Sequence, residues 1–330
     1  MSTPERFRAF RIHDDAAGYR SGIDIVSLDD LSPGEVVIRA RHSSVNYKDA
    51  LAGTGQGRIL RRFPLVGGID VAGHVMASTD PAFREGDAVL CTGCGLSETR
   101  DGGYSEVVRL PAAWTIALPA GLSLRESMIL GTAGFTAGLA LLRMLENGQA
   151  PELGPIAVTG ASGGVGSLAV AIFSKAGFAV HAISGKADQA GYLRGLGADE
   201  VLPREAALTA KPMDSVRFGG ALDNVGGAML AGLLAQVAPY GNVASCGLAG
   251  SHALDATVMP FIIRGVSLLG IASAGTARAQ RDRVWQQLAT DWKPPGLDAI
   301  CTRETTLDGL SGVFGGMLAG QSLGRTIVNL

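Results

Sequence analysis

The sequence predicts an α/β protein in which a β-rich domain precedes a doubly wound parallel sheet. Three observations lead to this fold class. Strand-like segments separated by Gly/Pro turns fill the first part of the chain, and short apolar strands alternate with helical segments from about residue 156 onward. Where that alternation begins, a glycine-rich turn joins a strand to a helix, as in proteins that bind dinucleotides.

The β-rich domain is predicted to cover residues 1–122. Residues 35–41 and 87–90 alternate apolar and polar side chains in the manner of strands, and Gly/Pro turns separate such segments. A Pro/Gly break at 118–122 ends the domain, and a helix-like stretch at 124–146 follows it.

A strand, a glycine-rich turn and a helix are predicted in succession from residue 156. Gly160, Gly163 and Gly166 are spaced three apart between a β-branched segment and an apolar helical one. Glycine lets the backbone turn sharply and approach a pyrophosphate closely, and the first N–H groups of the helix attract an anion. The sequence around the turn makes a dinucleotide site the favoured interpretation over a purely structural glycine turn.

The residues after this turn complete a parallel sheet with right-handed crossovers. They predict strands at 180–183, 200–202, 221–225, 242–245 and 267–271, with helices at 189–196 and 229–237. We therefore expect a dinucleotide-binding domain over residues 123–272. Residues 273–330 hold a helix-like stretch and a last strand at 324–329, and we expect them to return to the first domain.

The segment after the second strand of this sheet indicates which nicotinamide cofactor is used. An NAD site places Asp or Glu there to hold the ribose 2′-hydroxyl, whereas this chain has Ser184, Gly185 and Lys186, with no carboxylate before Asp188. A hydroxyl, a backbone N–H and an ammonium suit a 2′-phosphate, and Arg204 after the third strand adds a guanidinium. NADPH is therefore favoured over NADH, with ordinary surface charges as the alternative interpretation of the two basic residues.

Composition and charge exclude several classes of protein. The chain has 28 Lys and Arg against 30 Asp and Glu, and no long basic cluster interleaved with aromatic residues, so no nucleic-acid surface is expected. No stretch appears long and apolar enough for a membrane span, and the first residues lack the apolar core of a signal peptide. We expect a cytoplasmic protein.

No metal site is predicted. Cys91 and Cys94 have the spacing of a metal-binding pair, but Cys246 and Cys301 stand alone and the five histidines form no ligand pair. Packed thiols in a reducing cytosol are the preferred interpretation, and a redox disulfide between Cys91 and Cys94 stays open as the alternative.

Several motifs spread over nearly the whole chain resemble the medium-chain dehydrogenase/reductase superfamily. They lie at 44–49 (Ser-Val-Asn-Tyr-Lys-Asp), 68–73, 131–137, 158–166, 246–250, 259–264 and 324–326. The set resembles the zinc-independent, NADPH-dependent acrylyl-CoA reductase branch, a neighbour of the quinone oxidoreductases. The resemblance implies a GroES-like β domain, an inserted Rossmann domain and a C-terminus that returns to the first.

The resemblance also implies chemistry without a metal. Alcohol dehydrogenases of the superfamily carry a zinc-ligand Cys where this chain has residues 46–49, and a Gly-His-Glu motif where it has 66–70. Without a Lewis acid a simple ketone is hard to polarise, but an enoyl thioester accepts hydride at its β-carbon because the charge spreads to the thioester oxygen. We expect NADPH-dependent reduction of a short enoyl-CoA, acrylyl-CoA to propionyl-CoA above all.

The cofactor contacts implied by the resemblance fall into three groups. The pyrophosphate turn contributes Ser162, Gly163, Gly164 and Val165, and the 2′-phosphate is surrounded by Ser184, Gly185, Lys186 and Arg204. Four further positions line the cofactor in the family, and here they are Tyr47, Leu248, Ile262 and Ser273.

Catalytic and substrate residues are less clearly indicated. Tyr47 is the first candidate, as a phenolic donor to the substrate oxygen or the nicotinamide amide, although packing on the nicotinamide explains it equally well. Asp49 and Lys48 are alternative proton carriers. Arg61 and Arg62, with Arg58, could hold CoA phosphates, against the alternative of a solvated basic loop.

Two other functions stay open. A quinone or enone reductase would use the same hydride chemistry on a neutral acceptor, and a non-catalytic NADPH-binding protein would use the fold alone. The family tends to form dimers, so a homodimer is expected by resemblance, with a CoA thioester as the small-molecule partner.

Overall fold

The computed structural model describes residues 4–330, which form two compact units. The first unit consists of the chain up to Thr132 together with Ala274–Arg283 and Leu297–Leu330, and the second of Ala133–Ser273 and Val284–Gly296. The predicted bounds lay at 122/123 and 272/273, whereas the first unit extends to Thr132 and the second takes Val284–Gly296 from the predicted return segment. One reason is that Val284–Gly296 packs in the second unit, where Trp285 stacks on Phe135 with ring centroids 6.1 Å apart.

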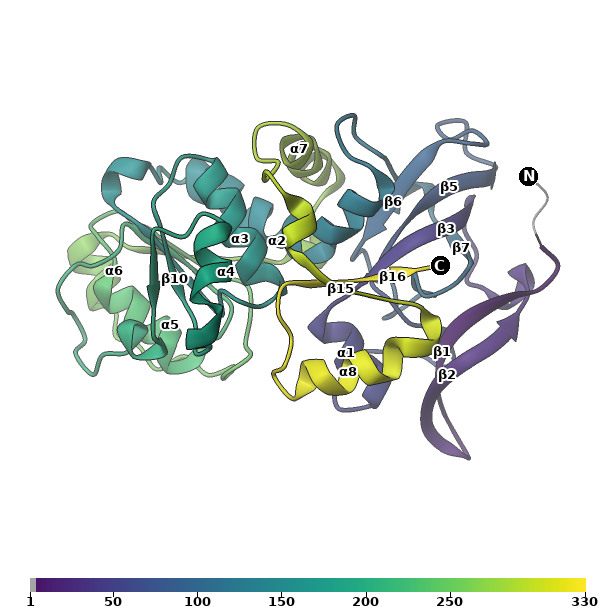
Figure 1. Cartoon of the computed structure of the whole chain (residues 1–330), viewed down its shortest axis with the longest axis horizontal. Coiled ribbons are helices and arrows are strands. Elements are labelled where there is room, and N and C mark those ends of the chain that lie inside the picture. The colour runs from purple at the N-terminus through teal and green to yellow at the C-terminus, as the bar shows by residue number, and fades with distance from the viewer. Residues whose placement is uncertain (1–3) are drawn as a thin grey trace. The chain divides into compact units, whose positions relative to one another are not determined.

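The first unit is built around a seven-stranded sheet. Its strands run in the order β15-β16-β3-β5-β6-β8, and β7 also pairs with β3. The bounds are β3 Val36–Val45, β5 Asp70–Ser78, β6 Ala88–Thr92, β7 Val107–Leu110, β8 Ile116–Ala117, β15 Cys301–Thr305 and β16 Arg325–Asn329. The last strand, β16, pairs antiparallel with β3, so segments far apart in the sequence lie side by side in one sheet (Figure 1).

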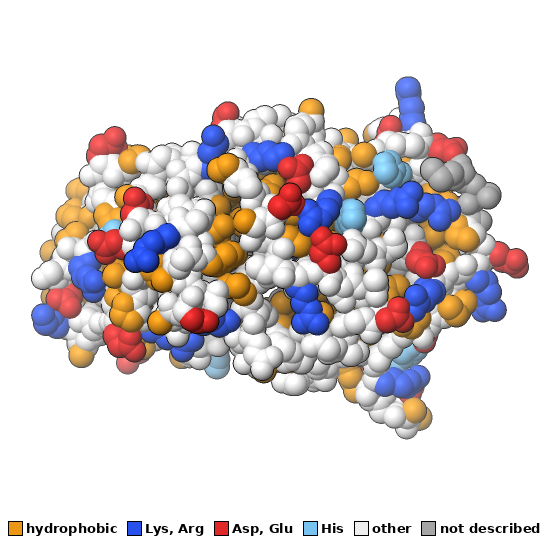
Figure 2. Space-filling view, viewed as in Figure 1, with side chains coloured by type: hydrophobic (Ala, Val, Ile, Leu, Met, Phe, Trp, Pro, Cys, Tyr) orange, Lys and Arg blue, Asp and Glu red, His pale blue; other side chains and the backbone are white. Residues whose placement is uncertain are grey.

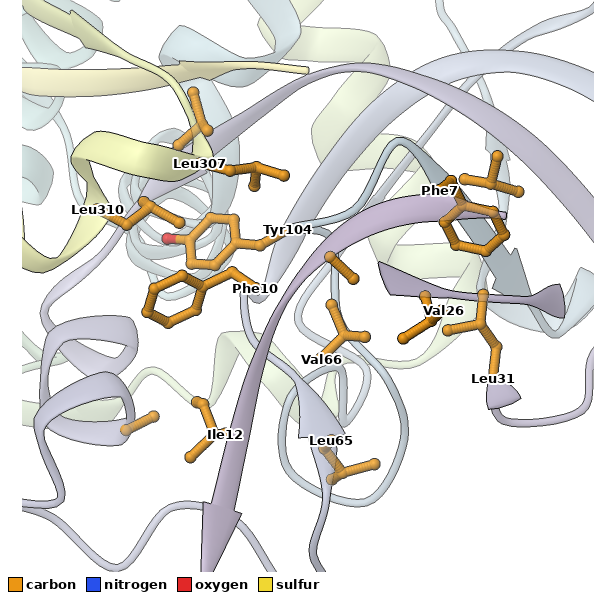
Figure 3. Packing of buried hydrophobic residues seen from close by; sticks show 14 of the residues in the cluster. Phe7, Phe10, Ile12, Val26, Leu31, Leu65, Val66, Tyr104, Leu307 and Leu310 are labelled. Atoms are coloured by element: carbon orange, nitrogen blue, oxygen red, sulfur yellow. The ribbon is translucent and has the colours of Figure 1, made fainter. Parts of the chain in front are cut away.

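A smaller sheet and two helices complete the core of this unit. The sheet has the order β2-β1-β4, with β1 Phe7–Asp15, β2 Gly18–Val26 and β4 Leu65–Val66. The helices are α1 Tyr47–Thr54 and α8 Leu310–Leu318. Figure 3 shows Phe10 and Tyr104 packed beside Leu307 and Leu310, and the Phe10 ring also meets that of Phe314 edge-on at 5.7 Å.

The second unit contains a six-stranded sheet in which every neighbouring pair is parallel. Its order is β11-β10-β9-β12-β13-β14. Strands β10 and β11 are added on one side of β9 and strands β12 to β14 on the other, so the strand order reverses between β9 and β12. The strands are β9 Ile156–Thr159, β10 Val180–Ile183, β11 Glu200–Leu202, β12 Gly220–Asp223, β13 Asn242–Ser245 and β14 Ser267–Gly270. The helices that follow these strands are α3 Gly164–Lys175, α4 Ala190–Gly195, α5 Gly227–Gln236 and α6 Met259–Arg264. The predicted fold class is confirmed.

Two helices contribute residues to both units. They are α2 Leu124–Glu146 and α7 Arg278–Ala289. In α2 the backbone leaves the helical region at Gly131, with φ 50° and ψ −157°, and the division of the chain falls just after this kink. A Cβ at Gly131 would lie 2.7 Å from Asp70 Oδ2 and from Ser44 Oγ, so only glycine fits there.

The apolar composition of α2 corrects one expectation. Within residues 4–330 it is the one helix that is long and apolar enough to cross a membrane, whereas the sequence was expected to contain no such stretch. Most of the helix is buried inside the protein, which explains its composition without a membrane. On the face shown in Figure 2, acidic and basic side chains are interspersed.

Candidate functional site

The glycine-rich turn of the second unit lies at the carboxyl end of β9. Gly160 adopts φ +58°, and a Cβ at Gly166 would lie 2.2 Å from the Gly160 carbonyl oxygen, so the start of α3 packs directly on the turn. The helix begins at Gly164 after the N-cap Gly163, and its first N–H groups have no partner within the helix. The predicted residues Ser162, Gly163, Gly164 and Val165 therefore form the kind of close-approach turn that holds a pyrophosphate.

The predicted 2′-phosphate residues gather at the neighbouring strand ends. Ser184 directly follows β10, and its N–H donates to the Leu202 carbonyl at the end of β11 at 3.0 Å. A Cβ at Gly185 would lie 2.4 Å from Arg204 Nε, so the guanidinium lies against the Gly185 backbone. The Ser184 hydroxyl accepts the Lys186 N–H at 3.1 Å and lies 3.3 Å from the Ser162 hydroxyl, which links this group to the turn.

The remaining predicted cofactor residues of this unit lie in segments after β13 and β14. Leu248, in the loop after β13, has 66% of its side chain exposed, and Ile262, on α6, has 77% exposed. Ser273 is half-buried at the end of the unit, in the 3-10 turn Ser273–Gly275.

A polar network at the point where the strand order reverses was missed by the sequence analysis. The buried Asp223 carboxylate accepts a hydrogen bond from Thr159 Oγ1 at 2.7 Å and one from the Gly226 N–H at 2.7 Å. Burial raises the pKa of Asp223. The Asn224 side chain bonds the Thr159 carbonyl, and the Cys246 thiol donates to Asn224 Oδ1 at 3.2 Å. Polar residues at the end of a predicted strand were the signal that could have revealed it.

This network also explains a difference from the predicted strands. β12 ends at Asp223 rather than at the expected Val225, because the Asp223 carboxylate binds the N–H groups of Val225 and Gly226 and turns the chain.

In the first unit, the predicted catalytic residues lie on α1 and differ in exposure. Tyr47 is the first residue of the helix and is 49% exposed. The Lys48 ammonium pairs with Glu98. Asp49 is only 2% exposed and accepts hydrogen bonds from the N–H groups of Asn46 and Ile69 at 2.9 and 3.0 Å.

The carboxylate of Asp49 is held by the protein itself. Its carboxylate belongs to a capping box with Asn46 at the start of α1, which holds it inside the protein. Burial raises the pKa of Asp49 to about 7, and the negative charge of Asp70 acts in the same direction. Asp49 thus caps the start of α1, and its role as a proton carrier stays a prediction.

Asp70 lies in the segment 66–70, where the resemblance described above implies that a zinc-ligand motif has been lost. Here its carboxylate is fully buried and accepts hydrogen bonds from Ser44 Oγ at 2.5 Å, Asn46 Nδ2 at 2.8 Å and Thr132 Oγ1 at 2.6 Å. The Arg325 guanidinium lies 3.9 Å away. The acceptor positions of Asp70 are thus taken by the protein itself, and among residues 4–330 no three His, Cys, Asp or Glu side chains cluster in a way that could hold a metal ion.

A cavity of about 730 Å³ opens beside α1, and only one of the two arginines predicted to bind substrate lines it. Basic and acidic side chains both line it, among them Lys48, Arg58, Arg61 and Glu98. Arg62 does not line it, because its guanidinium donates to the Thr99 carbonyl at 2.9 Å and to Ser32 Oγ at 2.5 Å. Of the two arginines predicted to hold substrate, Arg61 lies in the cavity and Arg62 has a structural role.

Family models match most of the chain. Residues 32–120 match the alcohol dehydrogenase GroES-like domain, and residues 164–290 match the zinc-binding dehydrogenase domain.

Full-length relatives carry two different functional names. The chain is 42% identical over 313 residues to the acrylyl-CoA reductase AcuI of Ruegeria pomeroyi, covering 94% of each chain. It is 44% identical over 326 residues to YhfP of Bacillus subtilis, covering 98% of this chain and 99% of YhfP, and YhfP is provisionally named a quinone oxidoreductase.

Solved structures of relatives differ in the cofactor bound. The YhdH oxidoreductase of Salmonella enterica, in complex with NADP, superposes with a TM-score of 0.94 at 43% identity and covers 98% of this chain and 99% of that one. YhfP of Bacillus subtilis, with NAD bound, superposes with a TM-score of 0.95 at 43% identity over the whole of both chains.

Proposed function

The chain belongs to the medium-chain dehydrogenase/reductase superfamily, and from this premise we propose that it reduces the carbon–carbon double bond of a short enoyl-CoA, acrylyl-CoA above all. It is an NADPH-dependent oxidoreductase that acts on CH–CH groups. The acyl group that it prefers is the part of the function that we propose.

The residues present fit NADPH. A Cβ at Gly166 would clash with the Gly160 carbonyl oxygen, so glycine lets α3 start directly on the turn, where its first N–H groups can meet a pyrophosphate. A Cβ at Gly185 would displace the Arg204 guanidinium, so glycine lets this group lie beside Ser184. The strand end that would carry an acid in an NAD site presents Ser184, with the Arg204 guanidinium against the next residue. We propose that Ser162, Gly163, Gly164 and Val165 hold the pyrophosphate, and that Ser184, Gly185, Lys186 and Arg204 hold the 2′-phosphate.

When bound, the cofactor supplies a hydride. The protein has to orient the two reactants and to stabilise the negative charge that develops on the thioester oxygen. Tyr47 is our candidate donor for that oxygen, because it is exposed on the first turn of α1 while Asp49 is buried and Lys48 is paired with Glu98. Leu248, Ile262 and Ser273 are proposed to line the cofactor.

The observation that carries the choice of substrate is the cavity beside α1. CoA bears phosphate groups and a quinone bears none, and the cavity is lined by Lys48, Arg58 and Arg61. Guanidinium groups bind phosphate oxygens in a bidentate manner, which favours a phosphorylated substrate.

A quinone or enone reductase is the second candidate. The carboxylates of Asp14 and Glu98 line the same cavity and offset part of its positive charge, and a full-length relative carries the quinone oxidoreductase name. A neutral acceptor would use the same hydride chemistry without any need for the arginines.

The deciding experiment follows NADPH oxidation with acrylyl-CoA, crotonyl-CoA and a simple quinone. We expect the highest kcat/KM with acrylyl-CoA, and we expect the double variant R58E/R61E to raise KM for the thioester at least about tenfold. The matched control is Arg84→Glu, on an exposed turn of the same unit outside the cavity. Turnover of the quinone alone would assign the second candidate, and cofactor binding without turnover of any activated alkene would indicate a non-catalytic protein.

A homodimer is the assembly that we propose. β14 is the last strand of its sheet, so one edge of this strand is unpaired within the described chain, and Ile263 on the preceding helix is exposed. Light scattering of the purified protein distinguishes a dimer from a monomer.

A further inference from the structure

A pair of thiols, Cys91 and Cys94, lies at the end of β6 and has no part in the proposed reaction. Cys91 is fully buried in the core on that strand, opposite Val71 in the register, whereas Cys94 is partly exposed. Neither cysteine forms a disulfide in this structure.

The backbone after β6 makes a tight turn at residues 93–95. Gly93, Cys94 and Gly95 all have positive φ, at 65°, 57° and 94°. Side chains other than Gly, Asn or Asp rarely adopt this region, so a cysteine held there is an unusual choice that its surroundings must enforce. The turn is fixed by the Gly93 N–H bonding the Ile69 carbonyl at 2.8 Å and the Cys94 N–H bonding the Ala274 carbonyl at 3.3 Å.

The two sulfur atoms interact directly and unequally. A hydrogen bond from the Cys91 thiol, with a smaller contribution from the nearby Arg281 and Arg278 guanidinium groups, lowers the pKa of Cys94 to about 7. The same hydrogen bond and burial raise the pKa of Cys91, and the Asp70 carboxylate adds to that effect. Arg281 is held close to the turn, because its Nη1 donates to the Thr92 carbonyl at 2.7 Å.

This arrangement has the features of a reactive dithiol. In such a pair a partly exposed thiolate attacks an oxidant, and the neighbouring thiol then attacks the oxidised sulfur and displaces the oxygen bound to it. Two sulfur ligands make only half of a tetrahedral metal site, and no third His, Cys, Asp or Glu joins them among residues 4–330.

We propose that Cys91 and Cys94 are a redox-active site that closes to an intramolecular disulfide when the protein meets a peroxide. The Cys94 thiolate attacks one oxygen of hydrogen peroxide, the O–O bond breaks, and sulfenic acid and hydroxide result. Cys91 then attacks the Cys94 sulfur, the S–O bond breaks, and the disulfide forms with loss of water. Both sulfur atoms are oxidised by one electron and the peroxide is reduced by two, so the step balances.

The loop that carries Cys94 also carries part of the cavity wall. The Gly95 carbonyl accepts the N–H groups of Glu98 and Thr99 at 3.1 and 3.0 Å, and the Glu98 carbonyl accepts the Arg61 N–H at 2.8 Å. The Glu98 side chain pairs with Lys48. A disulfide between Cys91 and Cys94 is expected to shift this loop and, with it, the wall of the cavity. Oxidation should therefore alter KM for the thioester more than kcat. This effect on KM rests on the proposed function, whereas formation of the disulfide does not.

The disulfide itself can be tested without any substrate. Trypsin releases residues 85–100 as one peptide that contains both cysteines, because no Lys or Arg lies between Arg84 and Arg100. After treatment of the whole protein with hydrogen peroxide and blocking of free thiols, we expect this peptide to appear two hydrogens lighter and unblocked. Cys246 and Cys301 should remain blocked, and dithiothreitol should reverse the change.

Variants identify the attacking sulfur. Cys94→Ser should abolish the oxidised peptide and leave Cys91 unreacted, whereas Cys91→Ala should leave Cys94 to stop at sulfenic acid, which a dimedone probe detects. Cys301→Ser is the matched control and should behave as the wild type. The proposal is overturned if both cysteines of the wild type stay open to blocking at peroxide doses that oxidise Cys301, or if Cys94 is overoxidised without forming the disulfide.

Activity gives an independent readout. Oxidation should change the wild-type KM for the thioester several-fold and reversibly, and it should leave Cys94→Ser unchanged. If the oxidised peptide forms but the kinetics of the wild type do not change, the disulfide does not affect the cavity. If peroxide inactivates Cys94→Ser as much as the wild type, the inactivation comes from oxidation of another residue.

Discussion

The Arg325 guanidinium lies 3.9 Å from the Asp70 carboxylate, and the two side chains are only 2% and 0% exposed. The Ser44 hydroxyl stands between them, donating to Asp70 at 2.5 Å and accepting from Arg325 Nη2 at 2.7 Å. Arg325 also donates to the Ile129 and Val45 carbonyls, each at 3.0 Å. The last strand is thereby tied to β5, to the end of β3 and to the residues just before the kink of α2.

Removing Arg325 should therefore be costly. Arg325→Met leaves the buried Asp70 charge without its counter-ion, and we expect the free energy of unfolding to fall by about 3–5 kcal/mol in urea titrations. Arg20→Ala is the matched control, because the Arg20–Asp15 pair is about half exposed and its loss should change the stability little. Equal losses in the two variants would show that burial of the Asp70–Arg325 pair is unimportant.

Stability should depend on pH through Asp49. Its pKa of about 7 in the folded protein lies above the usual value near 4, so the folded state binds more protons between these values and stability falls as the pH rises. The contribution reaches at most about 4 kcal/mol. Urea titrations from pH 5 to pH 7.5 should show this slope in the wild type and a flatter one in Asp49→Asn, whose side chain does not ionise. An unchanged slope in the variant would contradict the assignment.

Cofactor preference should depend on Arg204. Arg204→Ala removes a guanidinium from the proposed 2′-phosphate site, and we expect KM for NADPH to rise about 10- to 100-fold while KM for NADH stays nearly constant. Arg194→Ala, on the exposed face of α4, is the control and should leave both constants unchanged. Parallel increases for the two cofactors would place Arg204 outside the phosphate site.

The close approach at Gly166 should not tolerate a methyl group. In Gly166→Ala the new Cβ would lie 2.2 Å from the Gly160 carbonyl oxygen, so the turn or the helix must move, and NADPH should bind at least about tenfold more weakly with a lower Tm. Gly191→Ala is the control, because no atom lies within 4 Å of its Cβ, and it should raise Tm slightly. Fluorescence titration and thermal unfolding measure both effects.

The hydroxyl of Tyr47 should matter for turnover. Tyr47→Phe keeps the ring but removes the donor, so we expect kcat to fall about tenfold or more while the Kd for NADPH changes little. Tyr240→Phe, at a tyrosine that is 76% exposed, provides the control. Unchanged turnover would leave Tyr47 with a packing role only.

The parallel sheet was predictable because each buried strand is a short apolar run between turn residues. The predicted starts of β9, β10, β11, β13 and β14 agree with the structure, whereas β12 starts one residue earlier than predicted and β14 ends one residue earlier. The largest difference is the end of β12, which a side-chain bond at Asp223 moves two residues earlier. The hairpin of β1 and β2 was not predicted, although Phe7, Ala9 and Ile12 are buried and Gly18 adopts the positive φ of a turn.

The site was less predictable than the fold, because contacts between distant segments decide it. Arg61 and Arg62 are equivalent in the sequence, yet only Arg62 is bound by Ser32 and Thr99. Asp49 could have been recognised from the sequence, since Asn46 followed three residues later by an acid is a capping signal. The burial that raises its pKa depends on packing that no local pattern shows.

The pairing of β16 with β3 has a consequence for synthesis on the ribosome. β3 is made before the second unit, whereas Arg325–Asn329, which pairs with residues 42–45 of β3, is made after it, so this part of the β3 edge stays unpaired while the second unit is synthesised. Domains usually fold in the order in which they are made. In this protein the first unit is begun before the second but can be completed only after it.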